Sequence, residues 1–205
     1  MPDLTSPPGP PKPLIRDYFM KMSSLRRVFF FPTIMYNVLA DTVTSRNWFN
    51  RIDEHIVLGA IPFRKALLHL ITTEDIKGVI SMNEEFELNP KWYATPAEMA
   101  RLDLEFLNLP VDDYVGLPSS EQIASGLDFI QHIITDKQGS VYVHCKAGRS
   151  RSAYLVTAYL IAKEGGKAED VIEHLKSKRP QVWIGPKGVR SLKDYYKEAI
   201  KRPVQ

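Results

Sequence analysis

Residues 141–163 read VYVHCKAGRSRSAYLVTAYLIAK, and they contain the only cysteine of the 205-residue chain, Cys145. The apolar run before the cysteine is typical of a buried strand in a parallel sheet. A loop of small and basic residues follows, and then an apolar stretch with helical spacing that stops at Gly165 and Gly166. The segment therefore predicts a strand, a short loop and a helix, with the thiol where the strand ends.

The loop after Cys145 has the composition of an anion-binding site. Its small residues let the backbone curl tightly and point the N–H groups of residues 146–151 inward, beside the positive end of the helix dipole. Arg151 stands six positions after the cysteine, and its planar guanidinium suits two phosphate oxygens at once. The loop residues expected to hold the anion are Lys146, Ala147, Gly148, Arg149 and Ser150.

Positive surroundings of this kind lower the pKa of a thiol, so that the nucleophilic thiolate is present near neutral pH. We therefore expect Cys145 to attack the phosphorus of a bound phosphate monoester. Two alternatives are a structural cysteine in the core and a pocket that binds phosphate without turnover. The agreement of loop composition, Arg151 and the strand–loop–helix order favours the catalytic interpretation.

The composition of the whole chain is that of a globular protein. Hydrophobic residues make up 44% and charged residues 25%, and a net charge of +3 is too small to indicate a nucleic-acid partner. A single cysteine excludes an intramolecular disulfide, and the five histidines have no metal-ligand spacing. No apolar run reaches the roughly 18 residues of a membrane span. We expect neither a metal nor another cofactor.

From Trp48 onward, predicted strands alternate with predicted helices. This order indicates a single α/β domain in which helices flank a mostly parallel central sheet of about five strands. The patterns predict strands over 55–62, 77–83, 104–111 and 140–145. They predict helices over 63–71, 123–134, 150–164, 168–178 and 189–200. Ser119 and Gln122 have the spacing of a capping box before a core-facing stripe of Ile123, Leu127, Ile130 and Ile134.

The N-terminal part differs from the rest of the chain. Residues 1–21 form a proline-rich tail that we expect to be disordered, because its first thirteen residues carry six prolines and no periodicity. Residues 22–44 combine arginines with an apolar core and have no acid before Asp41. This pattern is typical of a targeting or membrane-proximal segment, and the alternative is a helix packed on the domain. Translation from Met22 would leave a cleaner targeting signal.

The segment HCKAGRSRS resembles the His-Cys-x5-Arg-Ser/Thr signature of the cysteine-dependent protein-tyrosine phosphatase superfamily. The order of the chain, with an acidic loop upstream of the cysteine, resembles that of the dual-specificity branch of that superfamily. The stretches LRRVFFFPTIMYNVLA, WFNRIDEHIVLGAIPFR and GVISMNEEFE further resemble the mitochondrial phosphatases of phosphatidylglycerophosphate, from about Leu25 to Ile200. The resemblance implies a dual-specificity phosphatase domain over residues 45–203.

The resemblance also implies roles outside the loop. Asp113 stands five positions before Pro118, as the general acid of the family does, and the neighbouring Asp112 is the second choice. The hydroxyl of Ser152 is expected to stabilise the Cys145 thiolate as it leaves, and the alternative is simple hydrogen bonding at the start of the helix.

The EEFE segment resembles a family loop that borders the active site. Glu84 and Glu85 are therefore candidate substrate-binding residues, although a solvated acidic turn has the same composition. Gly185 departs from the family, which usually has an arginine at this position. Lys187 or Arg190 are the basic residues nearby that can take its place.

The expected substrate is an anionic phospholipid at a membrane surface. Lys146 and Arg149 add cations to Arg151, and phosphatidylglycerophosphate carries more negative charge than phosphotyrosine because it has a terminal monoester and an internal diester. The resemblance implies peripheral association with the matrix face of the mitochondrial inner membrane. The alternatives are a phosphatase of phosphoproteins or phosphoinositides, and a catalytically silent module that binds a phosphorylated ligand.

Overall fold

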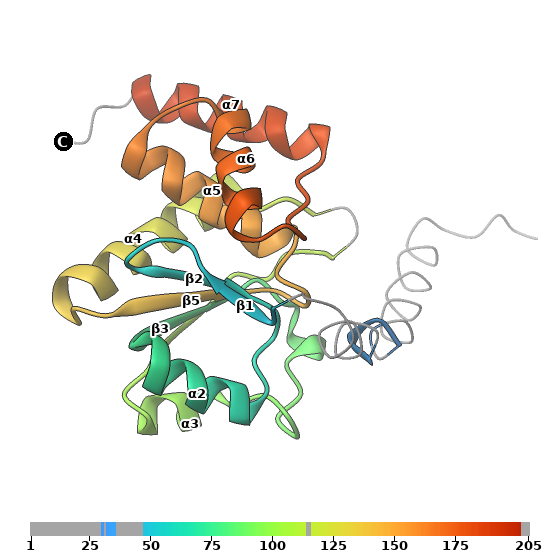
Figure 1. The fold of residues 1–205 in the computed structure, drawn as a ribbon, viewed down its shortest axis with the longest axis vertical. Coiled ribbons are helices and arrows are strands. Elements are labelled where there is room, and N and C mark those ends of the chain that lie inside the picture. Colours follow the sequence, from blue (N-terminus) through green and yellow to red (C-terminus); the bar gives the residue numbers. More distant parts are fainter. Residues whose placement is uncertain (1–29, 31, 36–46, 114–115, 202–205) are drawn as a thin grey trace, which may run out of the picture.

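A five-stranded sheet separates two layers of helices (Figure 1). The computed structural model describes residues 30, 32–35, 47–113 and 116–201. The strands lie in the order β1-β2-β5-β3-β4, and all neighbours are parallel except β1, which is antiparallel to β2. The strands are β1 (Phe49–Arg51), β2 (Ile56–Gly59), β3 (Ile76–Ser81), β4 (Glu105–Asn108) and β5 (Ser140–His144). The predicted fold class is confirmed.

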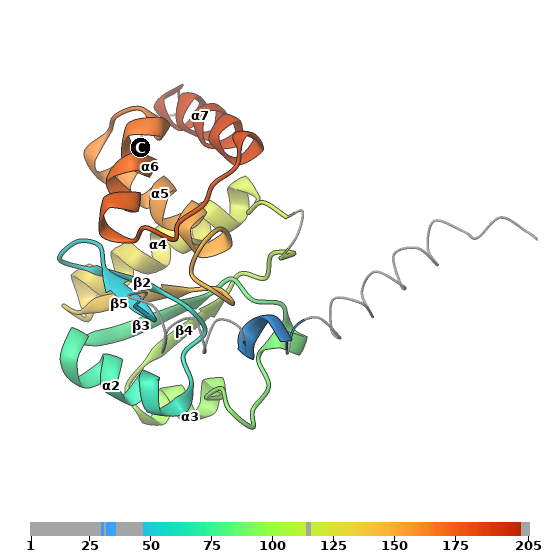
Figure 2. The same cartoon turned by 45° about the vertical axis from the view of Figure 1, so that its right-hand side comes forward.

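Helices α2 and α3 cover one face of the sheet, and α4 to α7 cover the other (Figures 1 and 2). The helices are α2 (Arg64–Glu74), α3 (Pro96–Arg101), α4 (Ser120–Asp136), α5 (Arg151–Glu164), α6 (Ala168–Lys178) and α7 (Pro186–Lys201), with a short 3₁₀ helix η1 (Glu85–Glu87). Because β2 and β5 are covered on both faces, every residue of these two strands is buried.

Besides the short η1, two elements were not predicted from the sequence. β1 has only three residues and pairs along one edge with β2, too short a segment for a periodic signal. α3 begins with Thr95 as its cap: Thr95 Oγ1 accepts from the Glu98 N–H, and Glu98 Oε2 accepts from the Thr95 N–H, so the missed signal was a capping box.

The predicted capping box of α4 is present. Ser119 Oγ accepts a hydrogen bond from the Gln122 backbone N–H at 3.1 Å, and Gln122 Oε1 accepts one from Ser119 N–H at 3.0 Å. The fully buried stripe differs slightly from the prediction, because the helix turns Leu127 and Ile134 to the edge of the core. The buried positions are Ile123, Gly126, Ile130 and Ile133.

The predicted tail, residues 1–21, lies outside the described residues, as does most of segment 22–44. Residue 30 and residues 32–35 are described, and they are helical. Phe30 and Ile34 are buried in the cluster formed by β2, α2 and α3. Within the described ranges, no helix combines the length and the apolar character needed to span a bilayer.

Candidate active site

The register of the sheet brings the carboxyl ends of three strands together. His144, the last residue of β5, lies opposite Gly59 of β2 and Ser81 of β3. Cys145 follows His144 directly, and α5 begins at Arg151, so residues 145–150 form the connecting loop. Ligand sites of parallel sheets lie at this carboxyl edge.

The connecting loop is held from outside by Arg179. This residue is 1% exposed, and its guanidinium donates to the carbonyl oxygens of Gly148 at 2.8 Å and Ala147 at 3.2 Å. The C=O and the following N–H of a trans peptide point in opposite directions. Arg179 therefore turns the N–H groups of Gly148 and Arg149 toward the interior of the loop.

Gly148 is the loop position that no other residue can occupy without strain. Its φ is +63°, and a Cβ there would collide with the Gly59 carbonyl group and lie 2.8 Å from the Arg179 guanidinium. Within the loop, Gly148 alone has a positive φ, and a left-handed residue beside right-handed ones is what curls a backbone nest around an anion. The predicted tight curl is therefore present, and it depends on close contact with β2.

The thiol of Cys145 is buried inside this loop. Ser152 Oγ donates a hydrogen bond to its sulfur at 3.3 Å. Burial by itself raises the pKa of the thiol, but the charge of Arg151, the Ser152 hydroxyl and the backbone N–H groups of Ser152 and Arg149 outweigh it and bring the pKa below its ordinary value. The surroundings thus favour the thiolate.

Arg151 is fixed by a buried carboxylate that the sequence analysis missed, Glu87. Its Nη1 donates to Glu87 Oε2 at 2.7 Å and its Nη2 to Glu87 Oε1 at 3.1 Å, a bidentate pair between two buried side chains. Nη1 also donates to the carbonyl oxygens of Val111 at 2.9 Å and Met82 at 3.2 Å.

Burial opposes the charge of Arg151, but Glu87, Cys145 and Asp113 outweigh that cost and raise its pKa, so the guanidinium stays charged. Among the described residues, no acceptor binds its Nε–H. One donor of the guanidinium is therefore left for a substrate oxygen.

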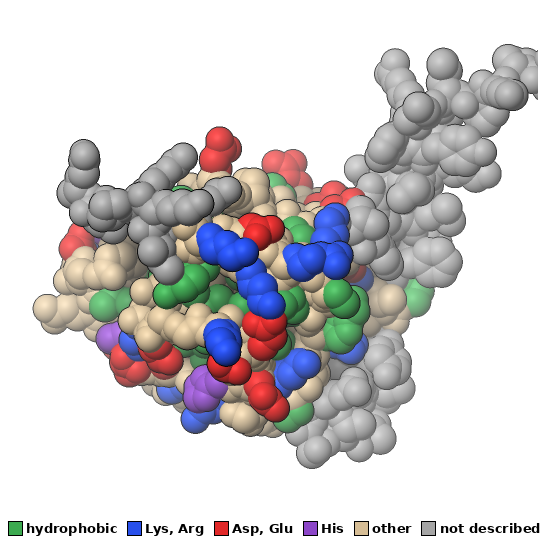
Figure 3. All heavy atoms as spheres, turned by 90° about the horizontal axis from the view of Figure 1, so that it is seen from above, with side chains coloured by type: hydrophobic (Ala, Val, Ile, Leu, Met, Phe, Trp, Pro, Cys, Tyr) green, Lys and Arg blue, Asp and Glu red, His purple; other side chains and the backbone are tan. Residues whose placement is uncertain are grey.

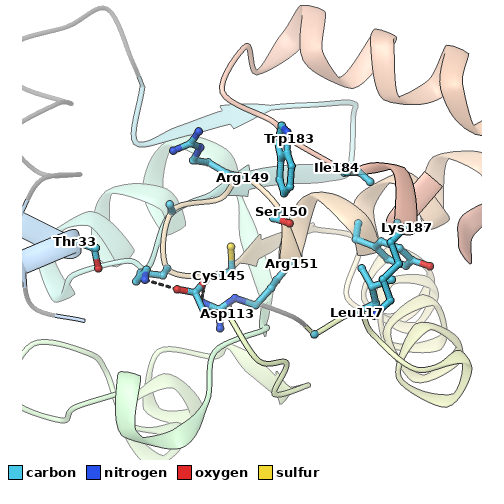
Figure 4. A pocket seen from close by; sticks show the side chains of 16 residues that line it. Thr33, Asp113, Leu117, Cys145, Arg149, Ser150, Arg151, Trp183, Ile184 and Lys187 are labelled. Carbon is cyan, nitrogen blue, oxygen red and sulfur yellow. Dashed lines mark hydrogen bonds and ion pairs between the residues drawn. The ribbon is translucent and has the colours of Figure 1, made fainter. Parts of the chain in front are cut away.

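Asp113 reaches the centre of the site. Its Oδ1 lies 2.8 Å from Arg151 Nη2, and its Oδ2 forms an ion pair with the ammonium group of Lys146. Figure 4 shows Asp113 beside Cys145 and Arg151. Asp113 lines the pocket around the thiol, whereas Asp112 does not. This geometry favours Asp113 over Asp112 as the group that exchanges protons with a substrate.

The pocket over the thiol has a volume of about 700 Å³ and combines basic with apolar walls (Figure 4). Arg149 lies at its rim, where its Nε donates to the Gln181 carbonyl at 3.2 Å. Lys187, at the start of α7, adds a second basic side chain. The apolar part of the wall includes Leu117, Trp183 and Ile184.

Gly185 explains the position of Trp183. A Cβ at Gly185 would lie 3.1 Å from the Trp183 ring, closer than ordinary packing distance, so the missing side chain leaves room for the indole. Trp183 is 62% exposed at the mouth of the pocket. Of the two basic residues considered as replacements for the family arginine, Lys187 lines the pocket and Arg190 does not.

Glu84 and Glu85, the candidate substrate-binding residues, lie outside the lining of the pocket. Glu84 caps η1, where its backbone N–H donates to Glu87 Oε2 at 2.8 Å, and the Glu85 side chain is exposed. Neither side chain lines the pocket. The reason is the turn of η1, which directs Glu87 to Arg151 and leaves the Glu84 side chain to cap the turn.

His144 supports the end of β5 from below the loop. Its Nε2 lies 3.0 Å from the hydroxyl of Tyr93, and both side chains are buried. Burial lowers the pKa of His144 to about 3, so the ring is neutral at physiological pH. A neutral ring in contact with Tyr93 is suited to orienting the loop rather than to proton transfer. Within the described part of the chain, no three potential ligands gather to hold a metal ion.

A thiol and an arginine facing each other across an anion-binding loop, at the end of the central strand, define a cysteine-dependent phosphatase site. A model of the dual specificity phosphatase catalytic domain matches residues 63–198, and the chain belongs to this family.

The chain is 38% identical over 183 residues to the phosphatidylglycerophosphatase and protein-tyrosine phosphatase 1 of Rattus norvegicus. The aligned region covers 88% of this chain and 94% of that protein. It is 35% identical over 163 residues to the phosphatidylglycerophosphate phosphatase PTPMT2 of Arabidopsis thaliana, covering 78% and 68%. A crystal structure of PTPMT1 in complex with PI(5)P matches with a TM-score of 0.72 and 35% identity, over 76% of this chain and 99% of that one.

Proposed function

We propose that the protein removes the terminal phosphate of phosphatidylglycerophosphate and so produces phosphatidylglycerol for cardiolipin synthesis. The observation that carries the proposal is the pocket itself, which joins a thiol of lowered pKa and a bidentate Arg151 with further cations and an apolar wall. The names of the relatives support the same substrate.

In the first step, the Cys145 thiolate attacks the phosphorus atom in line with the leaving glycerol oxygen. A sulfur–phosphorus bond forms as the oxygen–phosphorus bond breaks, and protonated Asp113 gives its proton to the glycerol oxygen. Arg151 and the backbone N–H groups of the loop, from Lys146 to Ser150, bind the equatorial oxygens as charge shifts among them. Ala147 and Gly148 contribute backbone groups only.

In the second step, water attacks the phosphocysteine. Asp113, now a carboxylate, takes a proton from the water, the phosphorus–sulfur bond breaks, and inorganic phosphate and the Cys145 thiolate result. Ser152 Oγ, at 3.3 Å from the sulfur, donates to the thiolate as it leaves. The site thereby returns to its initial charge state.

The preference for a lipid rests on the rim of the pocket. Lys146 points inward to Asp113, so the side chains placed to meet the internal phosphodiester are Arg149 and Lys187. The apolar side chains of Trp183 and Leu117 lie beside them and suit the glycerol and acyl part of a lipid.

The distribution of charged side chains also favours the mouth of the pocket as the side that faces the membrane. On the face formed by α6 and α7, basic and acidic side chains are interleaved (Figure 3), as in the ion pairs Lys193–Glu169 and Lys197–Asp194. Lys187, at the pocket rim, has no acidic partner among the described residues. We therefore place the mouth of the pocket, and not the α6–α7 face, against an anionic membrane.

The location follows from the same proposal. The similarity to PTPMT1-type enzymes supports a mitochondrial protein, and we propose peripheral association with the matrix face of the inner membrane. A tagged full chain, translated from Met1 or from Met22, should be recovered with mitochondria and released from their membranes by alkaline carbonate. A tagged protein that stays in the cytosol from both start sites would refute the location.

The decisive experiment compares substrates at matched concentration. Phosphate release is measured from phosphatidylglycerophosphate in vesicles, from phosphatidylinositol 5-phosphate in the same vesicles, and from a phosphotyrosine peptide, with Cys145→Ser as the blank. We expect kcat/KM for phosphatidylglycerophosphate to exceed both others at least about tenfold. A higher value for the peptide would make the protein a protein phosphatase.

The second candidate is a phosphoinositide phosphatase, which is favoured by the solved relative that contains PI(5)P. It would be supported by a higher kcat/KM for phosphatidylinositol 5-phosphate in the same comparison. A silent binding module predicts no turnover of any substrate, including a generic aryl phosphate. Turnover that Cys145→Ser abolishes would exclude it.

A further inference from the structure

The helical residues 30 and 32–35 lie at the carboxyl edge of the sheet, beside η1 (Figures 1 and 2). Phe30 is only 3% exposed, which is unusual for a segment with the composition of a targeting signal. Its ring meets the ring of Phe86 edge to face, with centroids 6.0 Å apart. Ile34, one turn later, is buried in the same cluster.

Phe30 contacts the active site on a second side as well. The ammonium group of Lys146 lies 5.9 Å from the centroid of the Phe30 ring, within the range of a cation–π interaction. Thr33, on the next turn, lines the pocket, and Figure 4 shows it on the opposite side from Leu117 and Lys187. The segment is thus one wall of the site.

These contacts reach both charged pairs of the mechanism. Phe86 precedes Glu87, which holds Arg151, and Lys146 holds Asp113. A single aromatic ring therefore supports the turn behind the arginine and the lysine beside the proposed acid.

We propose that Phe30 is a positioning residue of the active site, which acts on Asp113 through Lys146, and that the mature protein retains it. Any removal of the N-terminal segment then ends before Phe30. The part of this inference that concerns Asp113 rests on its proposed role as the general acid, and it is independent of the lipid substrate.

The experiment uses the full chain and two soluble substrates. Phenyl phosphate has the more basic leaving group and needs the acid, whereas para-nitrophenyl phosphate needs it much less. The variants are Phe30→Ala, Phe30→Leu, which keeps an apolar side chain without the ring, and Asp113→Asn. Met35→Ala is the matched control, because Met35 is on the same segment and 64% exposed.

We expect Phe30→Ala to lower kcat for phenyl phosphate about tenfold and kcat for para-nitrophenyl phosphate less than about threefold. The kcat of Phe30→Leu for phenyl phosphate should lie between those of Phe30→Ala and the unmodified protein. Met35→Ala should have the kcat of the unmodified protein for both substrates. Equal losses for the two substrates would show a role in folding alone, and no loss would show that the contact is dispensable. Both results overturn the inference.

Asp113→Asn separates the two proposals. If Asp113→Asn lowers kcat equally for phenyl phosphate and para-nitrophenyl phosphate, Asp113 is not the general acid, and the inference about Phe30 fails as well. If Asp113→Asn lowers kcat more for phenyl phosphate than for para-nitrophenyl phosphate and Phe30→Ala does not, Asp113 remains the acid and only the inference about Phe30 fails. Mass spectrometry of the protein isolated from its own cells gives the second readout: we expect an N-terminal residue at or before Phe30, and a mature chain that begins after it would refute retention.

Discussion

Replacing Arg179 by lysine should both destabilise the protein and slow catalysis, although Arg179 lies outside the pocket. To residues that the structure describes, its guanidinium donates five hydrogen bonds. Besides the carbonyl oxygens of Gly148 and Ala147 in the loop, the acceptors are the carbonyl oxygens of Asn47 at 3.0 Å and Trp48 at 3.3 Å and the side chain of Asn50 at 2.6 Å. The guanidinium thus ties the catalytic loop to the segment that enters β1.

The magnitude follows from counting donors. A lysine ammonium group has three donors on one atom, so at least two of the five bonds are lost. Hydrogen bonds to charged groups contribute about 1.5–3 kcal/mol each, and the expected loss in the free energy of unfolding is about 3–6 kcal/mol. For a domain of this size, Tm should fall by about 6–24 °C.

Activity should fall for a separate reason. Once the Gly148 and Ala147 carbonyl groups lose their anchor, the N–H groups that follow them are no longer held toward the phosphate. Removing one such donor from an oxyanion site costs about 10²–10³ in kcat, so loosening two should cost at least about tenfold. The assays are thermal unfolding by circular dichroism and hydrolysis of para-nitrophenyl phosphate well below the new Tm.

Arg51→Lys is the matched control for Arg179→Lys. Arg51 also donates five hydrogen bonds, but its side chain is 37% exposed and lies away from the loop. Water can replace the lost bonds there, so we expect a loss of at most about 1 kcal/mol and unchanged kcat. If Arg179→Lys has the same Tm as Arg51→Lys, or lowers Tm without lowering kcat, the proposed support of the loop is wrong.

Four further variants test other parts of the site. Asp113→Asn should lower kcat for phosphatidylglycerophosphate by about 10²–10⁴, while Asp112→Asn stays within about threefold; the reverse order would make Asp112 the acid. Ser152→Ala should raise the pKa of the Cys145 thiol, because the hydroxyl no longer donates to the sulfur, so alkylation by iodoacetamide should begin at higher pH, and an unchanged profile would remove Ser152 from thiolate stabilisation. Trp183→Ala should lower kcat/KM for the lipid about tenfold more than for a phosphotyrosine peptide, and equal losses would exclude a lipid-specific contact.

The catalytic loop was predictable because its determinants are contiguous. Cys145, Arg151 and Ser152 lie within one strand–loop–helix segment, and the geometry that brings them together follows from the local chain. The family and the fold class were therefore predicted correctly from a short signature, because a cysteine at a strand end, a loop of small residues and an arginine at the helix start rarely occur together outside this family. The same holds for the start of α4, where the residues of the capping box are three positions apart.

Glu87 and Arg179 were missed because their partners are distant in sequence. Glu87 and Arg151 are separated by 64 positions, and Arg179 and Gly148 by 31. The EEFE segment has three glutamates that the sequence does not distinguish, and the turn of η1 decides which of them reaches Arg151. Arg179 follows two lysines of α6 that resemble a solvated helix end, but Pro180 prevents the helix from continuing and Arg179 is directed into the core.

The two carboxylates of the site differ in how firmly they are held, and this difference separates their roles. Glu87 is buried, binds Arg151 through both oxygens and also accepts from the Glu84 backbone, so breaking it away would leave a buried charge without its partner. Asp113 is partly exposed and is held by Arg151 and Lys146 through one oxygen each. An incoming phosphate competes for the same guanidinium, and the carboxylate that yields is the one at the edge. In the proposed mechanism, Arg151 therefore exchanges Asp113 for substrate without losing its orientation, and Asp113 stays beside the reacting phosphate, where it can turn to the leaving oxygen.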